Sequence, residues 1–363
     1  MLTALPHTPK KGRGAVTNAT GRFEPRTAEA VDDGWDLDDS DLPKLRTTVT
    51  IERPKTIITR NTSPDVPFDR SINPYRGCEH GCVYCFARPT HAFHGLSPGL
   101  DFESKLFAKP DAAALLDAAL RKPNYKPAPI AIGTNTDPYQ PIEREHRIMR
   151  SVLEVLDAFN HPVSIVTKSA MVSRDLDILG PMAARGLASV GLSVTTLDRD
   201  LARRMEPRAA TPGRRLATIR ALSEAGVHTF CLAAPMIPGL NDHELEAIIE
   251  AAVEAGARGA GYVLLRLPLE IKDLFTEWLD QHEPGRKSKV LNMMRETRGG
   301  ALYVTDWGTR QRGTGQYADL LEARMKGIKK RLGLVEAERP AESPLRTDLF
   351  QPPPQAGDQL KLL

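Results

Sequence analysis

The chain has 363 residues, 41% of them hydrophobic, which is enough for one large domain or two smaller ones. Its formal net charge of +3 is too small to indicate a polyanionic partner, and it neither supports nor excludes nucleic acid. No apolar run approaches the length of a membrane span and the N-terminus lacks an apolar signal segment, so we expect a cytoplasmic protein with no membrane partner. Four cysteines, three of them clustered, favour a reducing compartment over a disulfide scaffold.

Residues 1–45 are predicted to form a disordered, charged N-terminal tail. A small basic group at residues 10–13 precedes an acidic stretch over residues 32–41, and charge blocks with little hydrophobicity favour disorder. An arm that closes over substrate or binds a partner is the alternative. Residues 46–70 contain two β-rich segments and predict a short β lead-in.

The next segment carries three of the four cysteines within eight residues, in a C-x3-C-x2-C spacing. They are Cys78, Cys82 and Cys85. Three thiolates on one loop can bind a single inorganic centre, but they leave one of its four positions without a protein ligand. A [4Fe-4S] cluster held in this way keeps one iron open to an external ligand. The alternative is a zinc site completed by His80, His91 or His94, although zinc ligands usually come as two separated pairs.

Beyond the cysteines, short apolar strands alternate with helical patterns. The predicted strands are 129–132, 163–166, 189–194, 228–233 and 261–265. The predicted helices are 111–121, 143–159, 174–185 (capped by Ser173), 214–225 and 244–255. With a first strand just before Cys78 this makes six βα units, too few for an ordinary eight-fold barrel. We therefore expect an α/β fold, a partial (β/α)6 barrel of parallel strands over residues 71–267.

From residue 268 the pattern becomes helical, and a helical C-terminal extension is predicted over residues 268–334. Its helices are expected at 274–281, 287–297 and 320–332, and the last of them is basic. Residues 335–363 are rich in proline and are predicted to form a disordered tail.

The cysteine spacing, with Tyr84 before the last cysteine, resembles the signature of the radical S-adenosylmethionine (SAM) superfamily. Segments 71–77, 133–143 and 206–208 resemble the branch that includes spore photoproduct lyase and the DNA repair photolyase-like proteins. The usual Gly-Gly-Glu after the second strand is absent, and a Thr/Asp pair stands in its place. The resemblance implies a radical SAM barrel, a [4Fe-4S] cluster and S-adenosylmethionine as cofactors, and an electron donor such as flavodoxin or ferredoxin.

The activity implied by this resemblance is reductive cleavage of SAM to methionine and a 5′-deoxyadenosyl radical, which abstracts a hydrogen atom from a substrate. The motif does not identify the substrate, and the resemblance makes a nucleic-acid lesion one candidate. Spore photoproduct lyase depends on a thiol near the end of its second strand, where this chain carries Thr134. We therefore expect that this protein does not repair the spore photoproduct.

Polar residues and a proline at the ends of the predicted strands are the candidate SAM-binding residues. They are Thr134, Thr136, Asp137, Lys168, Ser193 and Pro235. An ammonium group needs acceptors, which two hydroxyls and a carboxylate supply after the second strand, and a lysine can pair with the methionine carboxylate. The resemblance favours the serine and assigns the proline turn to the adenine. The alternatives are an Asp-Pro turn, a surface lysine, ordinary strand residues and a helix-capping loop.

Four further residues are of interest, and three of them have two readings. Glu206 and Arg208 either pair with each other or face the substrate, and Arg266 at the end of the sixth strand is a substrate-side candidate. Cys231 is either a small buried hydrophobe or a thiol that takes part in radical chemistry. No catalytic side chain is assigned.

Two other functions stay open. A metal- or cluster-bearing nucleic-acid-binding protein without radical chemistry would use the basic C-terminal helix (Lys326, Lys329, Lys330) and the arm with Lys10 and Lys11. It does not explain the six βα units. A radical peptide- or protein-modifying enzyme is the other alternative, although the chain lacks the second cysteine cluster that many such enzymes carry.

Overall fold

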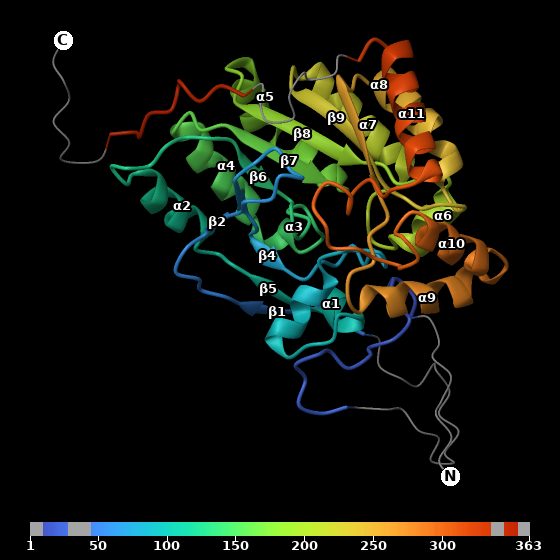
Figure 1. Ribbon diagram of the computed structural model, residues 1–363. Coiled ribbons are helices and arrows are strands. Elements are labelled where there is room, and N and C mark those ends of the chain that lie inside the picture. The colour runs from blue at the N-terminus through green and yellow to red at the C-terminus, as the bar shows by residue number, and fades with distance from the viewer. Residues whose placement is uncertain (1–9, 28–44, 335–344, 355–363) are drawn as a thin grey trace.

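The computed structural model describes residues 10–27, 45–334 and 345–354. Its centre is a seven-stranded sheet in the order β10-β9-β8-β7-β6-β3-β2 (Figure 1). The strands are β2 (Ile58–Arg60), β3 (Arg70–Ile72), β6 (Ile130–Ile132), β7 (Val163–Thr167), β8 (Ala188–Ser193), β9 (His228–Met236) and β10 (Gly259–Leu264). Every pair from β3 to β10 is parallel, and β2 pairs antiparallel with β3. The predicted α/β fold with six parallel strands is confirmed.

Helices follow the strands and cover one side of the sheet. They are α2 (Ala112–Leu120), α4 (Ile148–Ala158), α5 (Leu176–Ala184), α7 (Pro212–Glu224) and α8 (Leu245–Glu254). Alternate strand residues divide between the two faces, because successive side chains of a strand point in opposite directions. Leu192 and Cys231, which pair across β8 and β9, belong to the core beneath the helices. Gly191 and Phe230 face the other way, and a side chain at Gly191 would collide with the Phe230 ring.

A small second sheet holds the cysteine loop. It consists of β1 (Thr48–Ile51), β5 (Lys105–Ala108) and β4 (Tyr75–Arg76), with β5 between the other two. The cysteines follow β4, and the chain then passes through a 3-10 helix, η1 (Arg88–His94), and α1 (Leu100–Ser104) before entering β5. Figure 1 shows this region on the opposite side of the molecule from α8 and α11. The loop is therefore fixed at both ends by the same sheet.

Two predicted helices differ from those observed. The helix expected over 143–159 is split into α3 (Glu143–His146) and α4 by Arg147, whose backbone is left-handed with φ 51°. The buried Glu143 carboxylate accepts hydrogen bonds from Met149 N in the first turn of α4, which ties the two short helices together across this turn. The helix expected over 174–185 begins as a 3-10 turn, η2 (Ala170–Asp175), and Ser169 rather than Ser173 caps it. A helix that was not predicted, α6 (Arg199–Met205), begins where the Asp198 side chain accepts two backbone N–H groups.

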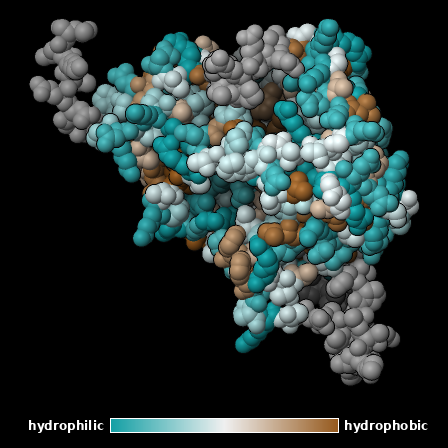
Figure 2. Space-filling model, in the orientation of Figure 1, coloured by the Kyte–Doolittle hydropathy of each residue, from teal (hydrophilic) through white to brown (hydrophobic). Residues whose placement is uncertain are grey.

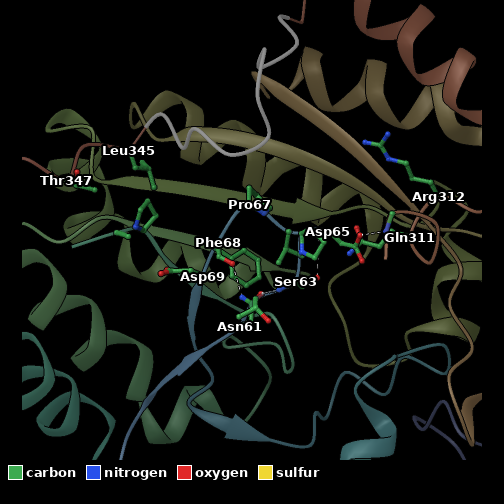
Figure 3. Close-up of a pocket in the computed structure, with 16 residues that line it drawn as sticks. Asn61, Ser63, Asp65, Pro67, Phe68, Asp69, Gln311, Arg312, Leu345 and Thr347 are labelled. Carbon is green, nitrogen blue, oxygen red and sulfur yellow. Dashed lines mark hydrogen bonds between the residues drawn. The ribbon is translucent and has the colours of Figure 1, made fainter. Parts of the chain in front are cut away.

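The C-terminal helices are α9 (Ile271–His282), α10 (Pro284–Glu296) and α11 (Gln316–Arg331), close to the predicted ranges. The segment between α10 and α11 joins the two edges of the open sheet. Leu264 N in β10 donates to Gln311 O, while Asp65, between β2 and β3, accepts from Gly308 N and pairs with Arg310. A cavity of about 1170 Å³ lies at this junction, where Asp65, Gln311 and Thr347 are among the lining residues (Figure 3). None of the predicted site residues lines it.

Parts of both predicted tails pack against the domain, which corrects the expectation of solvated segments. Ala15 and Val16 are buried, and Gly14 N and Ala15 N donate to the Glu103 carboxylate. Phe350 stacks on Phe159, whose carbonyl oxygen accepts from Gln351 N. The acidic stretch over 32–41 lies outside the described residues.

Among the described residues, no helix combines the length and the apolar character that crossing a bilayer requires. The face of the molecule in Figure 2 is mostly hydrophilic, and its hydrophobic side chains form small, separate groups.

Candidate functional site

The three clustered thiols lie on the loop after β4, within electrostatic reach of one another. Cys78 and Cys82 are buried, and Cys85 is partly buried. Burial raises the pKa of all three thiols, and the charges of Asp137, Cys82 and Cys85 raise the pKa of Cys78 further. Thiolates at such sites need a compensating positive charge, which a bound metal centre supplies. The donor set of three soft sulfurs fits a [4Fe-4S] cluster with one open iron.

A mononuclear zinc site has no matching arrangement in the described parts of the chain. There, no three His, Cys, Asp or Glu side chains come together where one metal ion could bind. His80 Nδ1 lies 3.3 Å from the Asp137 carboxylate, and His91 Nε2 lies 2.8 Å from Lys105 O. Cluster thiolates lie further apart than the ligands of one ion, because each binds a different iron, so this finding does not bear on a cluster.

Two glycines allow the loop to turn. Gly77 and Gly81 have φ values of 70° and 69°, a backbone region that side chains strongly disfavour. A Cβ atom on Gly81 would also lie 2.7 Å from Glu103 Oε2. The cysteine loop therefore requires glycine at both positions.

A buried ion pair anchors the cysteine loop, and the sequence alone did not predict it. Arg88 is fully buried and donates to four carbonyl oxygens, including those of Gly81 and Cys82. Its charge is matched by Glu103, 2.5 Å away, which also receives the backbone N–H groups of Gly14 and Ala15. The N-terminal segment thus closes over the loop. No local motif marks this contact, which joins residues 89 positions apart.

A second buried network ties the loop to the end of β8. The Tyr84 hydroxyl donates to Glu206, which also accepts from Thr195 Oγ1 and forms an ion pair with Arg215. Glu206 and Arg208 therefore do not pair with each other, which was one of their two readings. Glu206 is buried beside Arg215 because that cation lies in the first turn of α7, whereas Arg208 pairs with Glu79 at 3.2 Å.

The C-terminal extension completes the enclosure. Phe275 and Trp278 of α9 belong to the same apolar cluster as Cys82 and Tyr84. Trp278 Nε1 donates to Arg204 O at 3.0 Å, so this large side chain is buried with its polar atom satisfied.

The polar residues after β6 are already engaged within the protein. Thr134 Oγ1 lies 3.3 Å from Asn73 Nδ2, and the Thr136 hydroxyl donates to Tyr75 O at 3.0 Å. Asp137 accepts from Lys168 N and from Thr167 Oγ1, both at 2.7 Å. Burial opposes ionisation of Asp137, but His80 and these hydrogen bonds lower its pKa to about 2. Asp137 is thus a carboxylate that joins the ends of β6 and β7 to the cysteine loop.

Lys168 follows β7 and lies beside the thiols. Its Nζ is 5.8 Å from the centre of the Tyr84 ring, and its charge lowers the pKa values of Cys82 and Cys85 against the larger effect of burial. Within the described residues it forms no ion pair with a carboxylate. The ammonium group is therefore free to bind an anion at this end of the sheet.

The remaining predicted residues lie at the ends of β8, β9 and β10. Ser193 is buried, with its carbonyl oxygen bound to Arg215, and Pro235 O accepts from Asn241 Nδ2. The Arg266 guanidinium lies 5.1 Å from the ring centre of Phe86, the residue after Cys85, and its Nε is buried without a hydrogen-bond partner. Arg266 thus lies next to the cysteine loop.

Cys231 does not share this environment. Its side chain is fully buried in the core beneath the helices, and burial raises the pKa of its thiol to about 12. It behaves as a small core hydrophobe.

Comparisons with known proteins agree with this architecture. The sequence profile of the Radical SAM superfamily matches residues 72–252. The uncharacterized protein Rv2578c of Mycobacterium tuberculosis (strain ATCC 25618 / H37Rv) is 36% identical over 232 residues, 63% of this chain and 68% of that protein. The uncharacterized protein MJ0683 of Methanocaldococcus jannaschii is 28% identical over 173 residues, 48% of this chain and 62% of that protein.

The fold is similar to that of spore photoproduct lyase. The lyase complexed with dinucleoside spore photoproduct superimposes with a TM-score of 0.54 and 16% identity, covering 78% of this chain and 79% of that one. At this identity the likeness shows the fold alone. The profile and the fold together identify the chain as a member of the radical SAM superfamily, whose enzymes use a [4Fe-4S] cluster and S-adenosylmethionine.

Proposed function

We propose that this protein cleaves S-adenosylmethionine reductively and abstracts a hydrogen atom from its substrate, with Cys78, Cys82 and Cys85 holding the cluster. The observation that carries the proposal is the set of three thiols, two buried and one partly buried, on one glycine-bent loop beside the ends of parallel strands, where ligands of such sheets bind. When bound, the cluster and SAM supply a one-electron source and a carbon radical.

The protein's own residues position these groups and keep the site dry. The ion pair of Glu103 with Arg88 holds one side of the cysteine loop, and the hydrogen bond of Tyr84 to Glu206 holds the other side. The N-terminal segment and α9 cover the loop, which limits access of water and oxygen to the site.

The cofactor's methionine end is assigned to the ends of β6 and β7. Lys168 would pair with the carboxylate, because it is a cation without a carboxylate partner in the described structure and lies near two of the thiols. Thr134 and Thr136 would offer acceptors to the ammonium group, and Asp137 would act mainly by holding the two strands together. Ser193 and Pro235 are assigned to the ribose and the adenine.

The substrate differs from that of spore photoproduct lyase. No cysteine lies between Cys85 and Cys231, and the Cys231 side chain is buried on the helix side of the sheet. An O–H bond is too strong for the hydroxyl of Thr134 to return a hydrogen atom to a carbon radical. An electron donor such as flavodoxin or ferredoxin is part of the proposal.

The test is anaerobic reconstitution of the full chain with iron and sulfide, followed by reduction and addition of SAM. We expect a brown protein that releases 5′-deoxyadenosine, detected by mass spectrometry, and the release should be lost in Cys78→Ala. A colourless protein with stoichiometric zinc and no 5′-deoxyadenosine would overturn the proposal.

A further inference from the structure

A cavity of about 620 Å³ lies beside the cysteine loop, and we call it the arginine cavity. Four separate segments line it: the cysteine loop, the chain after β6, the turn after β7 and the chain after α6. Five of the thirteen lining residues are arginines and none is a carboxylate. The arginines are Arg144, Arg147, Arg174, Arg208 and Arg214.

Two of these arginines are neutralised within the protein and three are not. Arg174 pairs with the buried carboxylates of Glu143 and Asp175, and Arg208 pairs with Glu79. In the described part of the chain, Arg144, Arg147 and Arg214 have no ion pair and no side-chain hydrogen bond. All three are exposed to solvent. The cavity therefore carries an excess of about three positive charges, which favours an anionic ligand.

The backbone around the cavity adds to this field. Arg147 precedes the first residue of α4, and Arg214 lies in the first turn of α7, so two helices of 11 and 13 residues begin at its wall. Helix N-termini carry partial positive charge and unsatisfied N–H groups, which favour phosphate.

Arg147 also occupies a costly conformation. Its φ of 51° and ψ of 29° are left-handed, a backbone conformation that is less favourable for a residue with a side chain than for glycine. Glycine would make this turn without strain, whereas arginine adds a charge at the rim of the cavity.

We propose that the arginine cavity binds a phosphate-bearing ligand through Arg144, Arg147 and Arg214. Guanidinium groups match phosphate oxygens with paired, directional hydrogen bonds. The volume suits a small phosphorylated molecule or a few nucleotides of a strand. His80, which lies between two of the clustered cysteines, lines the same cavity, so a ligand held here lies next to the cluster loop. Its role as a substrate subsite rests on the proposed function, but the phosphate binding itself does not.

The basic surface of α11 is a weaker candidate. Lys326 pairs with Glu322 four residues earlier, and Arg331 pairs with Glu250 of α8. The cavity at Lys326 and Lys329 has a volume of only about 140 Å³. The charges on the basic surface of α11 are more fully neutralised than those of the arginine cavity.

The experiment measures binding to the full chain without SAM or reductant, using two probes. One is inorganic pyrophosphate, followed by calorimetry, and the other is a short fluorescent single-stranded oligonucleotide, followed by anisotropy. The variant Arg144→Ala/Arg214→Ala is compared with Arg220→Ala/Arg258→Ala, which removes two exposed arginines outside the cavity. We expect the first variant to weaken binding at least about tenfold, as for two lost charged contacts, and the second less than about twofold.

The probes distinguish the two sources of phosphate. If a nucleic-acid backbone is the ligand, the oligonucleotide binds and its uncharged methylphosphonate analogue does not. The slope of the logarithm of the binding constant against the logarithm of salt concentration should then be smaller in the cavity variant by about one to two. If a phosphorylated small molecule is the ligand, pyrophosphate binds and the oligonucleotide does not. Absence of binding to both probes, or equal weakening in both double variants, would overturn the proposal.

The variant Arg147→Gly tests the site without destabilising the fold. It removes a charge from the cavity and at the same time relieves the left-handed backbone strain, so weaker binding in this variant cannot be attributed to misfolding. It should weaken binding without lowering the melting temperature, and wild-type binding in this variant counts against the site. Iron content is measured in parallel. A protein that holds its cluster but binds no phosphate contradicts only this inference, whereas one that binds phosphate but holds no cluster contradicts only the proposed function.

Discussion

The cysteine loop and the arginine cavity are neighbours, yet their charges are handled in opposite ways. Around the loop, buried cations face buried carboxylates, as Arg88 faces Glu103 and Arg215 faces Glu206. In the cavity, three arginines have no carboxylate partner among the described residues. Matched buried charges fix one geometry, while unmatched exposed charges remain available to a ligand that comes and goes. The first arrangement suits a resident cofactor and the second an exchanging substrate.

The largest expected effect concerns the thiols themselves. Alanine at Cys78, Cys82 or Cys85 should each abolish the cluster, because the loss of one thiolate leaves two of the four irons without a protein ligand. Iron and sulfide analysis with visible absorbance measures the loss. Cys231→Ala should keep its cluster, since that side chain lies in the core. A cluster that survives any one of the three substitutions would remove that residue from the ligand set.

The second effect concerns the matched charges below the loop. Glu103→Ala should lower the free energy of unfolding by about 3–5 kcal/mol, because it leaves the buried Arg88 charge without a partner. Chemical denaturation measures this change, and reconstitution should yield less bound iron. The exposed Glu145→Ala is the matched control and should change stability by less than about 0.5 kcal/mol. Equal stability of the two variants would mean that the loop is not anchored through Glu103.

The third effect concerns cofactor affinity. Lys168→Ala should weaken SAM binding by about 1–3 kcal/mol, as for a lost charged hydrogen bond, and Thr136→Ala by an amount at the lower end of that range. Equilibrium binding to the reconstituted protein measures both. Lys122→Ala removes an exposed lysine elsewhere and should bind SAM as the wild type does. If Lys168→Ala matched that control, the methionine end of SAM would lie elsewhere.

The smallest effect concerns the strained turn at the cavity. Arg147→Gly should raise the free energy of unfolding by up to about 1 kcal/mol through relief of strain, offset in part by the greater entropy of the unfolded glycine chain. Thermal unfolding measures it, with Arg144→Gly, inside a helical turn, as the comparison that should lose stability. A loss of the same size in both variants would show that the left-handed turn is not strained.

Local patterns were sufficient for the parts of the fold that depend on neighbours in sequence. The cysteine spacing and the apolar strands predicted the loop and the parallel sheet, because both signals lie within a few residues. The break at Arg147 was missed because it depends on the Glu143 carboxylate, which binds the next helix. The closure of Gly14 over the loop and the arginine cavity were missed for the same reason. Each assembles segments that are far apart in the chain and share no motif.

The predicted cofactor residues divide in a similar way. Lys168 lies where a free cation was expected, whereas Asp137 turned out to bind backbone and side chains of its own protein. The sequence of a Thr/Asp pair does not show whether it binds the cofactor or other residues of the protein, because the partners of these side chains come from another strand.

The central claim is that three cysteines hold a cluster whose fourth iron is open to SAM. Electron paramagnetic resonance of the reduced, reconstituted protein, recorded with and without SAM, tests it most directly. The account predicts the signal of a reduced [4Fe-4S] cluster that changes shape when SAM is added, because SAM binds the open iron. A signal identical in both samples, with a full complement of iron, would contradict it.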